Sequence, residues 1–323
     1  MDDTVKPPTS SFGAAAYGGD GWLPRVAAHA GEIGPIWANC GIDSEWRRLT
    51  AVALCRPGPE IAVDNVDASQ FLGALDLGRA QSEHDRLAEC YRAEKVDVIM
   101  VGDVPRPSPN RMFCADLMVM TPEGVILGRP ASTVRAGEEV AVAAALAGAR
   151  VPILKTLTGQ ATFEGADLMW LDGETAIIGR GLRTNQEAID QIAQLMAEIG
   201  CDLIAVDLPY GTMHLMGMLR IADADLAIAW PRRTPHAAVT ALRERGYEVA
   251  FLPDGGEAEN NKALNFVTLG PRRILMPAGN PAARGFYEGL GVEVIETPMG
   301  ELKKAAGAVG CLTGVVGREM AQP

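Results

Sequence analysis

The sequence contains an internal repeat, and this repeat limits the fold more than any other feature. Residues 115–129 read ADLMVMTPEGVILGR and residues 166–180 read ADLMWLDGETAIIGR, with Ala, Asp, Leu, Met, Glu, Ile, Gly and Arg matching in register. Each copy has the pattern of a strand, a tight turn and a second strand. Weaker copies of the pattern occur at 266–278 and around 225–230. Repetition at this spacing predicts similar units arranged around a common axis.

Short apolar runs alternate with helical patterns along the chain, which indicates an α/β fold. The predicted strands lie at 49–55, 96–102, 117–121, 124–128, 168–172, 175–179, 202–208, 225–230, 266–270, 273–278 and 292–298. The predicted helices lie at 80–93, 137–147, 185–199, 235–246 and 281–290. Asn185 is positioned to cap the start of its helix, and Gly200 to stop it. If the units converge, Asp116 and Asp167 occupy equivalent strand starts and face one shared cavity.

Composition excludes several classes of protein. The chain has 323 residues, is 48% hydrophobic and carries a formal net charge of -12, so it can bury a large core and would repel a phosphate backbone. No apolar run is long enough to span a bilayer. The six cysteines show no paired spacing, which indicates free thiols in a reducing, cytoplasmic compartment. We expect residues 1–30 to be a flexible segment without a secretory signal and residues 31–323 to form one catalytic domain.

Several short motifs together resemble the guanidine-modifying superfamily, which comprises arginine deiminases, dimethylarginine dimethylaminohydrolases and amidinotransferases. The resemblance extends from about residue 49 to residue 319. The motif sequences are most similar to those of the dimethylaminohydrolases. The resemblance implies a five-bladed α/β propeller, the pentein fold. The motifs, in chain order, are FCAD at 113–116, RPASTVRAGE at 129–138, EGAD at 164–167, GRGLRTN at 179–185, YGTMHLMG at 210–217 and GCLTG at 310–314.

The resemblance implies that Cys311, His214 and Glu164 carry the catalysis. A guanidinium carbon is a poor electrophile, so a thiolate such as that of Cys311 is a suitable nucleophile. One histidine, His214, can then protonate the leaving amine and later activate water, while Glu164 orients the histidine. The alternatives are a buried structural cysteine and a structural or surface histidine. The other histidines, at positions 29, 84 and 236, lie outside the motifs.

Further residues are expected to hold the substrate. Paired carboxylates fix both the position and the plane of a guanidinium, which suits Asp116 and Glu164. By resemblance, Arg135 and Arg183 would grip a substrate carboxylate, although arginines that follow strands are often simply solvated. Asp167 is expected to support the turn behind the site.

One departure from the family pattern bears on the substrate. Arginine deiminases and amidinotransferases have an aspartate two residues after the histidine, where this chain has Met216. An unsubstituted guanidinium would leave N–H groups unpaired there, at a cost of roughly 1–3 kcal/mol for each group, whereas methylated nitrogens would not. A second departure is Ala115, where relatives often carry a charged residue, and it leaves the contacts at the far end of the substrate open.

The expected function is therefore hydrolysis of a small cationic guanidino compound through a covalent cysteine intermediate. N-methylated arginine, which would give citrulline and methylamine or dimethylamine, fits best. The alternatives are an arginine deiminase or an amidinotransferase, and a propeller that serves only as a binding module. No HxH, HExxH or paired-cysteine spacing indicates a metal, so we expect no metal, no cofactor, no nucleic-acid partner and no membrane partner. A homodimer is expected by analogy alone.

Overall fold

The chain repeats one supersecondary unit five times. The computed structural model describes residues 13–104, 107–253 and 255–321. Within them, fifteen strands form five sheets of three strands each. In four sheets the chain runs as an antiparallel hairpin, a helix and a third strand that is parallel to the second. This connectivity confirms the α/β class that the alternation of apolar runs and helical patterns predicts.

The four consecutive units have these bounds. The first is β3 (Met118–Thr121), β4 (Gly124–Leu127), α3 (Glu139–Gly148) and β5 (Ile153–Lys155), and the second is β6 (Leu168–Asp172), β7 (Thr175–Arg180), α4 (Gln186–Glu198) and β8 (Asp202–Asp207). The third is β9 (Leu219–Asp223), β10 (Leu226–Ala229), α5 (His236–Glu244) and β11 (Glu248–Phe251), and the fourth is β12 (Val267–Gly270), β13 (Arg273–Pro277), α7 (Pro281–Gly289) and β14 (Glu293–Thr297).

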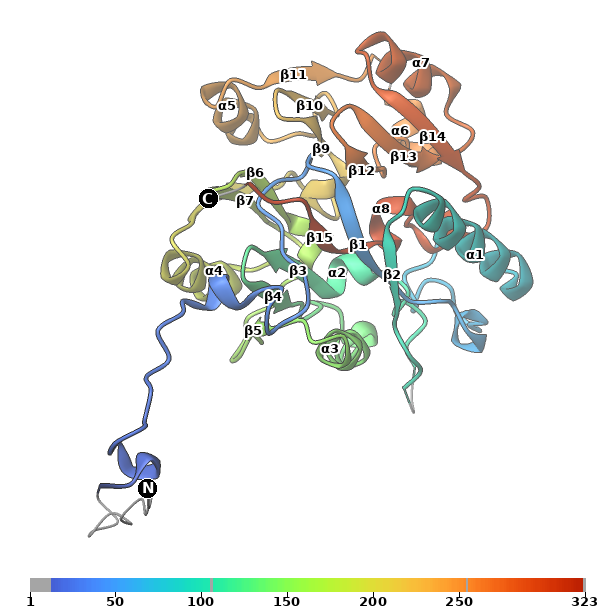
Figure 1. The fold of residues 1–323 in the computed structure, drawn as a ribbon. Helices are drawn as coiled ribbons and strands as arrows, with labels where there is room; N and C mark the ends of the chain where they lie inside the picture. Colours follow the sequence, from blue (N-terminus) through green and yellow to red (C-terminus); the bar gives the residue numbers. More distant parts are fainter. Residues whose placement is uncertain (1–12, 105–106, 254, 322–323) are drawn as a thin grey trace.

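In the fifth sheet, the last strand of the chain pairs with the first strand. The C-terminal strand β15 (Gly314–Arg318) pairs antiparallel with β1 (Leu49–Leu54), and β1 pairs parallel with β2 (Asp97–Met100) after helix α1 (Leu77–Ala93). In Figure 1, β15 and β3 lie near the middle of the molecule, and the long helices lie on its outside. Strand β15 contacts β3, and β9 contacts β12. These two pairs of units therefore meet through their first strands.

The predicted elements are all present, and their ends differ from the predictions by a few residues. Asn185 caps α4 by accepting a hydrogen bond from the backbone N–H of Ala188 at 3.0 Å, and Gly200 follows the helix with φ +76°. The sequence analysis missed four strands, namely β5, β9, β11 and β15. These strands are short, and their residues lack a long apolar run, so sequence periodicity gives them little signal.

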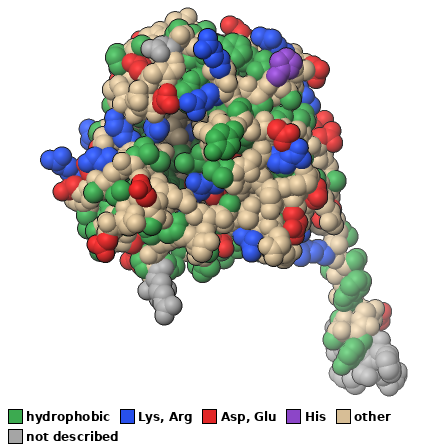
Figure 2. All heavy atoms as spheres, turned by 180° about the vertical axis from the view of Figure 1, so that it is seen from behind, with side chains coloured by type: hydrophobic (Ala, Val, Ile, Leu, Met, Phe, Trp, Pro, Cys, Tyr) green, Lys and Arg blue, Asp and Glu red, His purple; other side chains and the backbone are tan. Residues whose placement is uncertain are grey.

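The N-terminal part of the chain lies outside the main body. In Figure 1 the described residues before β1 begin with a segment that runs away from the sheets, and most side chains between residues 13 and 31 are exposed. The proposed boundary between residues 30 and 31 stays a prediction, and residues 1–12 of the predicted flexible segment lie outside the described residues. No helix within the described ranges is both long and apolar enough to cross a bilayer. On the face shown in Figure 2, basic and acidic side chains are mixed.

A glycine allows the backbones of the first two units to approach each other closely, next to Glu164. Gly165 lies in the short helical turn η6 (Gly165–Asp167). A Cβ atom added to Gly165 would lie 2.1 Å from the carbonyl oxygen of Met118 and 2.6 Å from that of Ala115. Because both neighbours are backbone atoms, no side-chain rotation can relieve this contact.

We therefore expect Gly165→Ala to lower the free energy of unfolding by about 1–3 kcal/mol, because the added methyl group must displace a neighbouring backbone segment. Urea unfolding monitored by circular dichroism measures the change. Gly289→Ala is the matched control, because Gly289 ends α7 and an added Cβ meets nothing within 4 Å; it should leave stability unchanged or raise it slightly. Equal effects of the two substitutions would contradict the close-contact explanation.

Candidate active site

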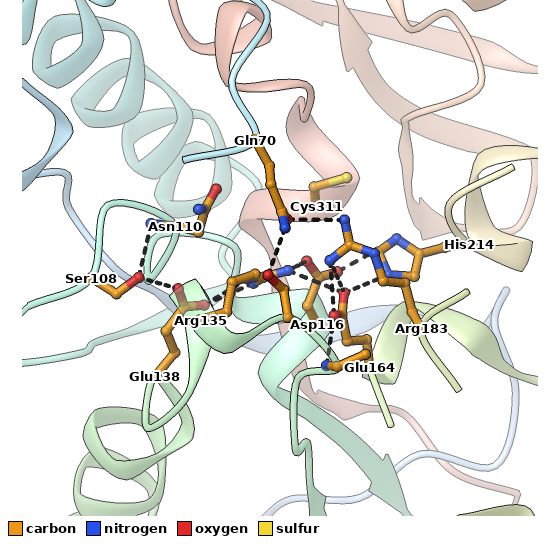
Figure 3. Close-up of polar contacts among 12 residues, drawn as sticks. Gln70, Ser108, Asn110, Asp116, Arg135, Glu138, Glu164, Arg183, His214 and Cys311 are labelled. Atoms are coloured by element: carbon orange, nitrogen blue, oxygen red, sulfur yellow. Dashed lines mark hydrogen bonds and ion pairs between the residues drawn. The ribbon is translucent and has the colours of Figure 1, made fainter. Parts of the chain in front are cut away.

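The polar residues of the site come from equivalent places in the repeated units. Each lies in the segment that precedes the first strand of its unit. Asp116 lies in α2 (Cys114–Leu117) before β3, Glu164 precedes η6 and β6, and His214 precedes η7 (Leu215–Gly217) and β9. Cys311 lies in α8 (Val309–Leu312), before β15. Because the first strands meet at the middle of the molecule, these four side chains come together from distant parts of the sequence (Figure 3).

Two adjoining cavities open onto Cys311. The larger has a volume of about 270 Å³, and Cys311, His214 and Met216 are among its lining residues, together with Asn265 and Trp230. The smaller, of about 20 Å³, is lined by Cys311 and by Asp116, Arg135, Arg183 and Gln70, among others. Cys311 is only 9% exposed, yet it lines both cavities.

His214 and Glu164 form a direct pair. Nε2 of His214 lies 2.7 Å from Oε2 of Glu164, and Nδ1 lies 3.9 Å from Oδ1 of Asp116. Burial lowers the pKa of His214, but Asp116, the hydrogen bond with Glu164 and the charge of Asp167 outweigh burial and raise it above the usual range. The imidazole therefore favours the protonated form at neutral pH and can donate a proton.

Glu164 is also the meeting point of two arginines. Nη1 of Arg183 donates to its Oε1 at 3.0 Å, and Nη1 of Arg135 donates to its Oε2 at 3.1 Å. Burial favours the neutral acid, but His214, Arg135 and Arg183 together hold the pKa of Glu164 below its usual range. Glu164 is thus an ionised carboxylate with no exposed surface.

Arg135 and Arg183 differ in how firmly they are held. Arg135 donates to Asp116 at 2.7 Å and to Glu138 at 2.9 Å in addition to Glu164, and it is 3% exposed. Arg183 has one further bond, from Nη2 to Oε1 of Gln70 at 3.2 Å. Both line the smaller cavity, so the expected carboxylate grip stays a prediction, and Arg183 is the more available of the two.

Asp116 keeps one free acceptor. Its Oδ2 accepts from Arg135, but its buried Oδ1 makes no hydrogen bond to any described residue. A buried carboxylate oxygen without a donor favours a cationic N–H donor from a ligand. Asp116 thus retains the capacity to bind a guanidinium.

Asp167 does not line either cavity, which corrects the expectation that it shares a cavity with Asp116. Its Oδ1 accepts from the backbone N–H of Leu215 at 3.0 Å, and its Oδ2 accepts from Thr184 at 2.7 Å. Burial raises the pKa of Asp167 to about 6. These bonds connect Asp167 to the turn that carries His214, and its supporting role stays a prediction.

Sequence reasoning missed Asn265, which lies before β12. Its Nδ2 donates to Sγ of Cys311 at 3.0 Å, and its Oδ1 accepts from the backbone N–H of Cys311 at 3.1 Å. The repeat offered a signal, because Asn265 precedes the first strand of its unit, as the other four residues do. The remaining histidines lie elsewhere: His84 is buried in α1, His29 contacts Glu123, and His236 begins α5.

One grouping of side chains in the described ranges has the spacing of a metal site. The ligand atoms of Asp116, Glu164 and His214 all lie within 4.8 Å of one another. Arg135 and Arg183 already neutralise these acids, so the arrangement needs no metal for charge balance. The expectation of a metal-free site stays a prediction.

Comparison with known proteins finds relatives that are similar over most of the chain. The arginine deiminase family model matches residues 104–240. N(G),N(G)-dimethylarginine dimethylaminohydrolase of Streptomyces coelicolor is 26% identical over 80% of this chain and 93% of its own length, and that of Pseudomonas aeruginosa is 25% identical over 76% and 91%. The chain is therefore similar to guanidine-modifying enzymes over most of its length, in agreement with its motifs.

Solved structures share the fold. The P. aeruginosa dimethylaminohydrolase, in a cysteine-to-serine variant complexed with citrulline, superposes with a TM-score of 0.69 at 22% identity and covers 82% of this chain and 98% of its own. The N-terminal domain of ArgZ, an arginine dihydrolase of cyanobacteria, gives 0.73 at 21% identity and covers 84% of this chain and 99% of its own. SxtG, an amidinotransferase of Microseira wollei, gives 0.71 at 16% identity and covers 87% and 98%.

The pair of His214 and Glu164 gives a test by pH. In Glu164→Gln the imidazole loses a carboxylate partner, so we expect the pKa of His214 to fall and the protonated form to be lost at a lower pH than in the wild type. An NMR titration of the imidazole protons measures this, with the signals of the exposed His236 as an internal reference that the substitution leaves unchanged. An unaltered titration of His214 would show that Glu164 does not control its charge.

Proposed function

We propose that this protein is an amidine hydrolase that cleaves a C–N bond of a guanidino compound through a covalent intermediate on Cys311. The main support is that three groups lie at two adjoining cavities. They are the thiol of Cys311, the imidazole of His214 hydrogen-bonded to Glu164, and the carboxylate of Asp116 with its unpaired oxygen. A propeller used only for binding would not need this set. The five sheets and the contacts between their first strands support a closed five-bladed propeller.

The reaction proceeds in two halves. A guanidinium binds against Oδ1 of Asp116, and the Cys311 thiolate attacks its central carbon. The leaving amine takes a proton from the His214 imidazolium, which leaves an amidino thioether on the sulfur. Water then gives a proton to the neutral His214 and attacks the same carbon. Collapse of this adduct expels the thiolate and releases a ureido product.

Binding of the substrate also favours ionisation of the nucleophile. Burial raises the pKa of the Cys311 thiol, and the Asp116 carboxylate raises it further, while the Asn265 amide lowers it. A substrate cation against Asp116 cancels the repulsion between that carboxylate and the thiolate. The thiolate therefore forms most readily when the substrate is in place.

The substrate class follows from the lining of the larger cavity. Met216 lies on its wall with His214 and Cys311, and Met218 and Trp230 add further apolar surface. An N-methylated arginine places its methyl groups against such a wall without unpaired N–H groups. The acidic clamp and the unsubstituted substrate of arginine deiminases fit this wall less well. Arg183 is proposed to hold the substrate carboxylate.

Mass spectrometry and a substitution of the nucleophile test the covalent step. Cys311→Ser should abolish turnover and keep the fold, because an alcohol is a far weaker nucleophile than a thiolate. Acid-quenched wild-type reactions with methylated arginine should show an amidino adduct on the peptide that contains Cys311. Cys90→Ser is a matched control, since Cys90 lies in α1 away from both cavities, and it should retain activity. A fully active Cys311→Ser variant would remove the proposal.

The apolar wall is tested by specificity. Met216→Asp would give an unsubstituted nitrogen an acceptor and place a carboxylate against methyl groups. The ratio of activity on arginine to activity on dimethylarginine should rise roughly tenfold if one charge-assisted hydrogen bond worth about 1.5 kcal/mol is gained. Met216→Asn separates charge from size and should change the ratio less. An unchanged ratio in Met216→Asp would mean that Met216 does not contact the distal nitrogens.

A further inference from the structure

A buried arginine behind the nucleophile has no acidic partner. Arg220 lies on β9 and is 6% exposed. Its Nε donates to the carbonyl oxygen of Leu264 at 3.1 Å, but its buried Nη2 makes no hydrogen bond to a described residue. No carboxylate among the described residues lies within 4.0 Å of its guanidinium, in contrast to the buried Arg111, Arg135 and Arg183.

Arg220 points at the turn that carries Cys311. A Cβ atom added to Gly310, the residue before Cys311, would lie 1.9 Å from Nη2 of Arg220 and 3.2 Å from Oδ1 of Asn265. The glycine therefore allows the guanidinium to approach the backbone immediately before the nucleophile. Arg220 and Gly310 also line a third cavity, of about 40 Å³, behind this turn.

A buried charge without a counter-charge is costly, and arginine does not give up its proton readily. The charged and titratable groups around Arg220 are Glu45, Tyr91, Tyr287, Cys311 and Arg318. Glu45 is not within ion-pair distance, and burial raises the pKa of both tyrosines well above its usual range, so neither tyrosine supplies a negative charge. The thiolate of Cys311 is the remaining source of one.

The groups that face Cys311 point to the same pairing. Asp116 and His214 face it from the substrate side, Lys262 lies across the larger cavity, and Arg220 lies behind it. His214 is committed to Glu164, and Nζ of Lys262 donates to the carbonyl oxygen of Glu259 at 3.0 Å. Arg220 is thus the fixed cation that no other described acid neutralises.

We propose that Arg220 is the buried counter-cation of the Cys311 thiolate, acting from behind the nucleophile across the Gly310 turn. It touches neither the substrate nor the reacting carbon, so it is a positioning residue that acts by stabilising the negative charge of the thiolate. The inference rests on Cys311 being the nucleophile of the proposed function. The thiolate and the guanidinium then stabilise each other, whereas Asn265 contributes neutral hydrogen bonds to the same sulfur.

The test follows the ionisation of Cys311 without any substrate. The rate of alkylation of Cys311 by iodoacetamide is measured against pH, with the Cys311 peptide quantified by mass spectrometry. In Arg220→Met the thiolate loses its counter-cation, so the rate at pH 7.5 should fall roughly tenfold for each unit by which its pKa rises. Arg220→Lys keeps the charge and should restore a large part of the rate. Because no turnover is needed, a failed substrate assignment leaves this readout intact.

Arg318 supplies the matched control. It is also buried and lines the same small cavity, but its Nη1 donates to the carbonyl oxygens of Arg47 and Thr268. Arg318→Met should shift the alkylation profile much less than Arg220→Met. Equal shifts, no shift in a folded Arg220→Met, or no recovery in a folded Arg220→Lys would overturn the assignment. If Arg220→Met does not fold, wild type is compared with Arg220→Lys alone. An alkylation rate that falls as strongly in a folded Arg220→Lys would contradict a role for the charge.

Discussion

The ionised carboxylate of Glu164 holds three units of the molecule together. It contacts His214 from the third unit of consecutive strands, Arg183 from its own unit and Arg135 from the first. A carboxylate with no access to water is stable only when such partners surround it. Removing one of them would leave an uncompensated charge, so the positions of the acid, the imidazole and the two arginines depend on one another.

This cluster explains how the site holds a protonated imidazole and an ionised carboxylate side by side. Asp116 gives one oxygen to Arg135 and keeps the other free, so it is anchored on one side and available on the other. His214 is held charged by the same acids. The site therefore presents a proton donor and a cation acceptor next to a thiol, and Arg220 balances the negative charge that the thiol acquires. Each charge has a partner in some step of the proposed reaction.

The sequence predicted much of this because repetition leaves a direct trace. The matching segments around Asp116 and Asp167 identified the hairpins, and the apolar periodicity with the Asn185 cap located the helices. The strands β5, β9, β11 and β15 were not found. For β5, β11 and β15, which are third or closing strands, pairing with a neighbour decides the structure more than their own residues do. Strand β9 begins its hairpin, but Arg220 and Asp223 leave it without a continuous apolar run. Asn265 was missed although its place before a first strand matches that of the other site residues, because a single amide indicates no chemistry until its contact with Cys311 is known.

The sequence by itself determined the α/β class, the repeated hairpins and the residue types from which the site is built. Local patterns fix these, because they depend on residues a few positions apart. Only the tertiary structure decided which charges meet: that Arg135 is engaged by three acids, that Asp167 turns away from the cavities to fasten the His214 turn, and that Arg220 lies behind Cys311 without an acid. Such pairings depend on distances between residues far apart in the chain, and burial gives them their strength.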